Sequence, residues 1–211
     1  IDHSFLKSQP KYQMTVSGLD AFCQGIESFW CVNSNDESLE FSRKAIAISW
    51  SNLKKAIDGE DVLDDLAKAS YFAGKAINIT KTTGPHSLSY GFTTNYGISH
   101  GHAVSLFLPF FINFHKNIDK ESCNDARGHL FVIKQMREIA DILRVNFFDL
   151  EHEIINFFKE LQIEINFNNL DINKEGFKKA IQGLNQDRLK NNPRFLSKLD
   201  ILEIHNYNST Y

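Results

Sequence analysis

The segment KTTGPHSLSYGFTTNYGISHGH, residues 81–102, is the part of the chain on which our interpretation of the fold depends. Within 22 residues it holds three of the eight histidines, four glycines and four threonines. His86 follows a Gly-Pro pair, and this break precedes a short helix predicted over residues 86–94. His100 comes 14 residues later and is predicted to open the next helix, residues 100–115. The two histidines are therefore expected at the ends of adjacent helices.

An aspartate lies upstream in a strongly apolar setting, within GLDAFCQGIE at residues 18–27. On a third helix, Asp20 would complete with His86 and His100 a set of oxygen and nitrogen ligands that suits Zn²⁺, Fe²⁺ or another first-row ion. Such a site keeps a coordination position open for water or substrate. Two alternatives remain open. Ser17 is a good N-cap, which would make Asp20 an acidic residue of the first helical turn, and each histidine could instead cap a helix or pack.

The other polar side chains of the segment support more limited predictions. His102 lies two residues beyond His100, so on a helix it points in another direction, and we expect it near a cofactor. Lys81 is the one charge in the approach to His86 and could attract an anionic group of a substrate, although most lysines are simply solvated. We predict that the remaining histidines are surface residues: His3, His115, His129, His152 and His205.

Bulk composition excludes several classes of protein. Hydrophobic residues make up 42% and charged residues 23% of the 211 residues, which is typical of a globular chain with a sizeable core. A net charge of −3 gives no electrostatic reason to bind nucleic acid or an anionic membrane. The sequence has no apolar run long enough to span a bilayer and no signal peptide. Three cysteines without CxxC spacing suggest reduced thiols, so we expect a cytoplasmic protein.

Long periodic segments and only four prolines predict an all-α fold, a bundle of about seven to nine helices in one domain, residues 1–211. Residues 1–16 are expected to form an irregular entry arm, and a helix is expected to follow Ser17 and to end near residues 33–35. The other predicted helices cover residues 37–57, 60–79, 86–94, 100–115, 124–143, 147–161, 174–182 and 196–206.

Two stretches resemble a known family, the iron-containing (group III) alcohol dehydrogenases. GLDAFCQGIESFW is similar to the family's GxDAxxHAxE, and AGKAINITKTTGPHSLSYGFTTNYGISHGHA resembles its AGxAxxxxxxGxxHxxxHxxGxxxxxxHGxA. The resemblance implies metal ligands at Asp20, His86 and His100. Gln24 stands where the family usually has a fourth ligand, a histidine, and its amide oxygen is predicted to be a weak, neutral ligand of the same ion. Tyr90 replaces a histidine implicated in proton relay near the nicotinamide, which makes it the implied catalytic residue.

The same resemblance implies an NAD(P)-dependent alcohol dehydrogenase or aldehyde reductase that uses a divalent metal ion, Fe²⁺ or Zn²⁺, as a Lewis acid. The chain corresponds to the helical C-terminal domain. It has no glycine-rich turn after a strand, so we expect the α/β nucleotide-binding domain to be absent from this chain and the chain alone to be inactive. The apolar surface that this domain would cover favours a homodimer.

Within the family, QGIESFWCVNS combined with KTTGPHSLSY is similar to the branch that reduces phosphonoacetaldehyde to 2-hydroxyethylphosphonate. Lys81, Thr82 and Thr83 are then candidates for binding the phosphonate, or else they only shape the loop. Three other functions stay open: a glycerol or sugar-alcohol dehydrogenase, a lyase like dehydroquinate synthase (which usually has glutamate in place of Asp20), and a non-catalytic helical metal-binding or assembly module.

Overall fold

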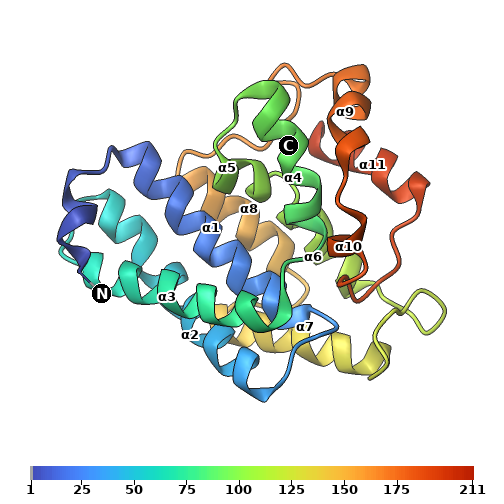
Figure 1. Cartoon of the computed structure of the whole chain (residues 1–211), viewed down its shortest axis with the longest axis horizontal. Helices are drawn as coiled ribbons and strands as arrows, with labels where there is room; N and C mark the ends of the chain where they lie inside the picture. The colour runs from blue at the N-terminus through green and yellow to red at the C-terminus, as the bar shows by residue number, and fades with distance from the viewer. Residues whose placement is uncertain (1) are drawn as a thin grey trace.

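Helices account for the regular structure of this protein in the computed structural model, which describes residues 2–211 (Figure 1). Eleven α-helices and two short 3-10 helices occur among these residues, with no strand and one isolated bridge between Cys123 and Arg194. This confirms the all-α prediction. The helices are η1 (His3–Ser8), α1 (Lys11–Trp30), α2 (Asp36–Ile57), α3 (Leu63–Thr80), α4 (Gly84–Tyr96), α5 (His100–Ser105), α6 (Leu108–Lys116), α7 (His129–Leu143), α8 (Leu150–Glu160), α9 (Lys174–Ala180), η2 (Ile181–Gly183), α10 (Gln186–Leu189) and α11 (Lys198–Asn208).

Helix α1 lies at the centre of the arrangement and packs against α2, α3 and α5 (Figure 1). Leu19, Phe22 and Ile26 are fully buried along it. Gly25 lets α1 approach α2 closely, because a Cβ atom there would lie 3.1 Å from the side chain of Ile46. The central helix can therefore contact the core and also face the segment that holds the histidines.

The irregular entry arm predicted for residues 1–16 is wrong over most of its length. Residues 3–8 form η1, and α1 already begins at Lys11 after Pro10. Proline is well placed there because its fixed φ suits a helix entry and its missing N–H is not needed. Ser17 is therefore not an N-cap, and Asp20 lies in the middle of α1. The alternative that Asp20 is an acidic residue of the first turn is thereby excluded.

Other helix boundaries also differ from the predictions; α3, for example, begins at Leu63 and not at residue 60. The helix expected over residues 100–115 is divided into α5 and α6, and Pro109 lies at the start of α6, where its missing N–H is tolerated. Asn35 caps α2 through a capping box with Ser38. Residues 124–128, expected to be helical, form a loop held by Arg127. Splitting one helix and adding the short α10 raises the count above the expected seven to nine.

The core contains one histidine that we predicted at the surface. His115 has no exposed surface and contacts Trp30 edge-on, with 4.6 Å between ring centroids. Because burial disfavours the charged imidazole and Arg194 adds a positive charge nearby, the pKa of His115 falls to about 3. The surface prediction failed because His115 lies on the buried face of α6, next to Phe111 and Phe114.

None of the helices among residues 2–211 combines the length and the apolar character needed to cross a membrane.

Candidate metal centre

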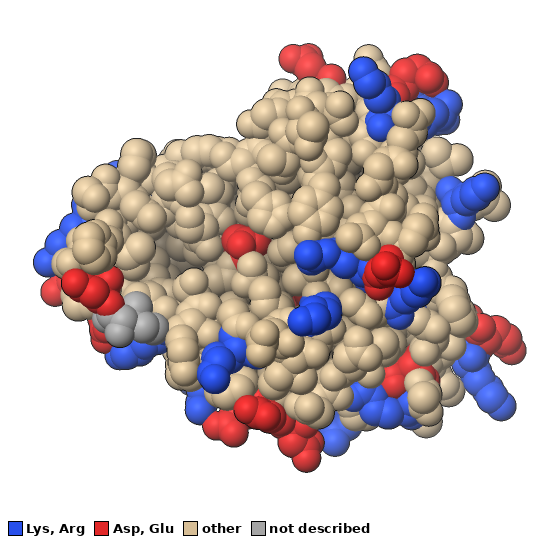
Figure 2. Space-filling model, in the orientation of Figure 1, with Lys and Arg blue, Asp and Glu red and all other residues tan. Residues whose placement is uncertain are grey.

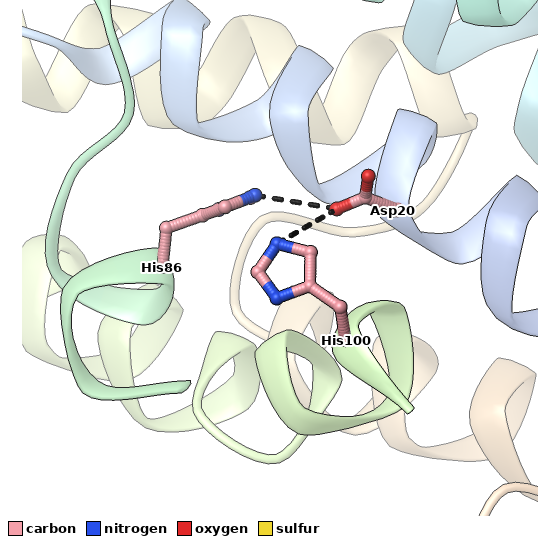
Figure 3. Close-up of side chains that lie close together, drawn as sticks. All are labelled: Asp20, His86 and His100. Atoms are coloured by element: carbon pink, nitrogen blue, oxygen red, sulfur yellow. Dashed lines mark hydrogen bonds and ion pairs between the residues drawn. The ribbon is translucent and has the colours of Figure 1, made fainter. Parts of the chain in front are cut away.

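Three side chains from three helices converge at one point, as Figure 3 shows: Asp20 from α1, His86 from α4 and His100 from α5. Asp20 Oδ1 lies 3.2 Å from His86 Nε2 and 3.8 Å from His100 Nε2. One ligand atom from each residue lies within 4.8 Å of the other two. The sequence prediction that these three residues meet is confirmed by this geometry, whereas metal binding itself stays a prediction.

The spacing of these atoms suits a shared ion. Ligands about 2.1 Å from a tetrahedral ion are about 3.4 Å apart, which falls between the two measured distances. A carboxylate oxygen and two imidazole nitrogens are donors that Zn²⁺ and Fe²⁺ accept, and three protein ligands leave one position free. The side chain of His100 is 39% exposed, so the site is open to solvent on that side. Asp20, His86 and His100 would therefore hold the ion and leave room for a small molecule.

A buried glutamate orients His86. Glu27, on α1, has no exposed surface, and its Oε1 accepts a hydrogen bond from His86 Nδ1. Its Oε2 accepts from the backbone N–H of Thr83 and from the Thr83 hydroxyl, both at 2.8 Å. Because the carboxylate only accepts, Nδ1 carries a proton, and Nε2 is left as the ring nitrogen that can bind an ion beside Asp20 and His100. Glu27 thus sets the tautomer that a metal ligand needs.

The pKa values of the two histidines shift in opposite directions, because burial prevails at His100 and the nearby carboxylates prevail at His86. Burial alone would lower the pKa of His86, but the charge of Glu27 and the hydrogen bonds to Asp20 and Glu27 outweigh burial and raise it to about 9. Burial also lowers the pKa of His100, and the opposing effect of Asp20 does not compensate. The two carboxylates thus favour positive charge at His86 in the metal-free protein.

Close backbone packing fixes the positions of the two histidines. A Cβ atom on Gly101 would lie 1.9 Å from the carbonyl oxygen of Val16, so glycine next to His100 allows α5 to touch α1. A Cβ atom on Gly84 would lie 2.2 Å from the ring of Phe111, which places the start of α4 against α6. Gly84 and Gly101 therefore allow the helix contacts that bring the two histidines to Asp20.

Gln24 and Tyr90 both lie beside the three ligand candidates. The Gln24 amide donates a 2.8 Å hydrogen bond to Asp20 Oδ2, which orients the carboxylate. The Tyr90 ring stacks on His100 with 5.6 Å between centroids and 15° between planes. Burial raises the pKa of Tyr90, although the charge of Arg188 opposes this shift. Ligation by Gln24 and catalysis by Tyr90 remain predictions.

The residues predicted to bind substrate occupy different environments. Thr83 is fully buried, and besides its bond to Glu27 its hydroxyl accepts a 3.0 Å hydrogen bond from Trp30 Nε1. Its hydroxyl is thus already used inside the protein. The Thr82 side chain is also buried, and its hydroxyl accepts a hydrogen bond from Arg188. Lys81 is exposed and follows the last residue of α3, where a φ of 64° ends the helix. Substrate contacts by these residues remain predictions.

His102, predicted to lie near the cofactor, points away from Asp20. Its Nδ1 lies 3.1 Å from the Tyr12 hydroxyl, and its Nε2 lies 2.6 Å from the carbonyl oxygen of Glu164. Burial lowers its pKa. These contacts tie α5 to the start of α1 and to the loop after α8, and a role toward a cofactor stays a prediction.

Two residues of this region were missed by sequence reasoning. Glu27 is an acidic residue within an apolar run, seven residues after Asp20. No basic residue lies near it in the sequence, and a carboxylate buried in such a run needs a partner, so a distant partner such as His86 could have been suspected. Arg188 lies on the four-residue helix α10, about 100 residues from Tyr90 and Thr82, and no spacing rule connects them.

A family model supports the resemblance seen in the two motifs. The model described as Fe-containing alcohol dehydrogenase family, C-terminal, matches residues 14–209. The chain therefore belongs to the iron-containing alcohol dehydrogenase family, and it corresponds to that family's C-terminal part.

Individual relatives agree with this assignment. The chain is 32% identical over 113 residues to the phosphonoacetaldehyde reductase of Streptomyces viridochromogenes, covering 52% of this chain and 29% of that protein. It is 27% identical over 134 residues to long-chain-alcohol dehydrogenase 1 of Geobacillus thermodenitrificans, covering 62% of this chain and 33% of that protein. The aligned stretches thus span about a third of these relatives.

Solved structures share the fold. The sulfoacetaldehyde reductase from Bifidobacterium kashiwanohense, in complex with NAD⁺, superposes with a TM-score of 0.84 and 21% identity. The match covers 99% of this chain and 53% of that chain. An iron-containing alcohol dehydrogenase from Thermotoga maritima gives a TM-score of 0.77 at 24% identity. The chain therefore spans about half the length of these relatives.

Proposed function

We propose that this chain is the metal-binding part of an NAD(P)-dependent reductase that converts a short aldehyde to its alcohol. The observation that carries the proposal is the convergence of Asp20, His86 and His100 on one open point, with Glu27 buried behind His86. Family membership and the names of the relatives support the reaction class. A buried carboxylate that fixes one imidazole tautomer is the arrangement expected around a ligand histidine.

When bound, a divalent ion would supply Lewis acidity at the substrate carbonyl and NAD(P)H would supply the hydride. The chain's own residues have three tasks. Asp20, His86 and His100 hold the ion, and Gln24 and Glu27 keep the first two oriented. The hydroxyl of Tyr90 is protonated at neutral pH, since burial raises its pKa above the ordinary value near 10, and it can donate a hydrogen bond to the substrate oxygen.

We also propose that the nicotinamide is bound by a domain outside these 211 residues. The chain covers 53% of the sulfoacetaldehyde reductase that was solved with NAD⁺. Phosphonoacetaldehyde is the substrate we propose first, because a phosphonoacetaldehyde reductase is among the relatives and because Lys81 and Arg188 place positive charge near the site.

The test is reduction of phosphonoacetaldehyde by the protein that contains this chain, with NADH and NADPH assayed separately after loading with Fe²⁺ or Zn²⁺. We expect metal-dependent oxidation of the nicotinamide, with His86→Ala and His100→Ala inactive and the exposed His152→Ala unaffected. The 211-residue chain alone should show none. Equal activity in the two site variants and wild type would reject the role of the site. Binding of metal without reduction of any aldehyde or oxidation of any alcohol would favour a non-catalytic module instead.

A further inference from the structure

Arg188 extends the candidate metal centre on the side of Tyr90. Its guanidinium carbon lies 5.3 Å from the centroid of the Tyr90 ring, and that ring in turn stacks on His100. Its positive charge opposes the burial that raises the pKa of Tyr90. Arg188, Tyr90 and His100 therefore form a row that ends at the point where Asp20 and His86 meet.

A surface hollow lies beside this row. Arg188 and Lys81 line it together with Thr82, Asn191 and Ile77, and its volume is about 360 Å³. Figure 2 shows basic side chains on this face between its centre and α10, close to an acidic group set in a depression. A hollow of this size accepts a molecule of a few carbon atoms with a charged end group.

The two cations of the hollow lack a carboxylate partner among residues 2–211. Arg188 donates to the Thr82 hydroxyl, and Lys81 donates to the backbone carbonyl of Asn78 at 3.2 Å. Asp187, the acid that also lines the hollow, is exposed and pairs with Lys190 at 2.9 Å. An arginine has five N–H donors, so most of those on Arg188 stay available to an anion.

The segment that carries Arg188 is fixed to the loop before α4 and to the start of α4, the helix that carries His86. The Ser87 hydroxyl donates to the carbonyl oxygen of Asn185 at 2.7 Å, and the Asn191 amide donates to the carbonyl oxygen of Thr82 at 3.0 Å. Asn185 also caps α10 by accepting from the N–H of Arg188 at 3.1 Å. The guanidinium is thus held at a defined place relative to the candidate ligands, as a residue that selects substrates must be.

We propose that Arg188, assisted by Lys81, binds the anionic end group of the substrate and makes the protein selective for short aldehydes that end in a phosphonate or sulfonate. A guanidinium can bind two oxygens of such a group at once, which a neutral aldehyde cannot match. The row through Tyr90 to His100 would leave the carbonyl end of the same molecule at the metal ligands. This inference rests on the proposed reductase function and names its substrate class.

Direct binding tests the inference without any turnover. The probes are methylphosphonate, followed by ³¹P NMR, and methanesulfonate, followed by calorimetry, each titrated into the protein that contains this chain. Arg188→Gln keeps a hydrogen-bonding side chain but removes the charge. Arg188→Lys keeps the charge but removes the planar guanidinium that can bind two oxygens at once. Lys120→Gln, at an exposed position, is the matched control for loss of a positive charge. We expect Arg188→Gln to weaken binding about 10- to 100-fold and Arg188→Lys less, with Lys120→Gln unchanged. Equal affinity in Arg188→Gln and wild type, or no binding to wild type, would overturn the inference.

Kinetics provides the second arm, with phosphonoacetaldehyde, sulfoacetaldehyde and uncharged propionaldehyde as substrates. The ratio of kcat/KM for a charged aldehyde over propionaldehyde should fall about 10- to 100-fold in Arg188→Gln and stay constant in Lys120→Gln. A parallel loss for all three aldehydes would show that Arg188 only supports the structure and would contradict the inference. If the wild type reduces no aldehyde, the proposed function fails, and the binding arm still decides the assignment of Arg188.

Discussion

Replacing Glu27 by glutamine tests whether His86 is held as a ligand. The side chain is buried and accepts hydrogen bonds from His86 Nδ1, the Thr83 N–H and the Thr83 hydroxyl. An amide cannot satisfy all three. If its NH₂ group faces His86, the ring must shift its proton to Nε2 and lose the lone pair that a metal needs. If its oxygen faces His86, the NH₂ group meets the Thr83 N–H, and a buried donor is left without an acceptor.

Either orientation costs about 1–3 kcal/mol, the usual penalty for a buried unsatisfied polar group. Since about 1.4 kcal/mol corresponds to a factor of ten, we expect Glu27→Gln to weaken metal binding about 10- to 100-fold, which is also the typical effect of removing a residue that orients a ligand histidine. The exposed Glu160→Gln is the control with the same chemical change.

The assay is competition for Zn²⁺ or Co²⁺ between the protein and a chromophoric chelator at pH 7.5, with circular dichroism to confirm that each variant is folded. Metal affinity in Glu27→Gln equal to that of Glu160→Gln would refute the reasoning. A lower affinity accompanied by loss of helical signal would show a folding defect. The substitution Thr83→Val, which removes the hydroxyl's bond to Glu27 and the bond it accepts from Trp30 Nε1, would then have to lower affinity in a folded protein.

Three further predictions concern the packing of Gly101, the burial of His115 and stabilisation by bound metal. Gly101→Ala should lower the free energy of unfolding by about 1–3 kcal/mol and weaken metal binding, because the added methyl group would collide with the Val16 carbonyl. The control Gly74→Ala places its methyl group in open space, so the free energy of unfolding should stay the same or rise by about 0.5–1 kcal/mol. Denaturant unfolding and chelator competition measure the two effects. His115 has a pKa of about 3 in the folded protein and about 6.5 in the unfolded chain, so its stabilisation is complete above pH 6.5 and is lost as the pH falls toward 3. Between pH 7.5 and pH 5 the wild type should therefore lose about 2 kcal/mol more than His115→Phe, and equal losses in urea unfolding would contradict this. Saturating metal at about 100 times its Kd should stabilise the chain by about 2.7 kcal/mol, and an unchanged Tm after addition of EDTA to the loaded protein would argue against a site.

The sequence indicated the three ligand candidates because their positions follow local rules. His86 and His100 lie next to helix breaks, and Asp20 lies in an apolar segment. These patterns left helix capping and packing open as alternatives, and the resemblance to the family was needed to favour a shared site. Helix α1 was placed too short because Pro10 and the residues after it were interpreted as part of an irregular arm that ended before Ser17, although proline also opens helices. His115 was misplaced because it was interpreted as part of a charged or amphipathic segment, whereas it lies on the buried face of α6.

Contacts between distant segments could not be predicted in this way. Glu27 reaches Thr83 and His86 across more than 50 residues of chain. Arg188 contacts Thr82, which lies 106 residues away in the sequence. Arg188 belongs to a helix of four residues, which is too short to show the apolar periodicity by which helices are predicted. Both depend on how α1, α4 and α10 pack together, which is a property of the folded chain and not of any window of its sequence.

Metal content of the purified chain tests the central claim most directly. After loading with Zn²⁺ or Co²⁺ and removal of excess ion, we predict one ion per chain for the wild type and for His152→Ala. Substantially less than one is predicted for His86→Ala and for His100→Ala, with the helical signal retained. Equal metal content in all four proteins would contradict the assignment of Asp20, His86 and His100 as a metal centre.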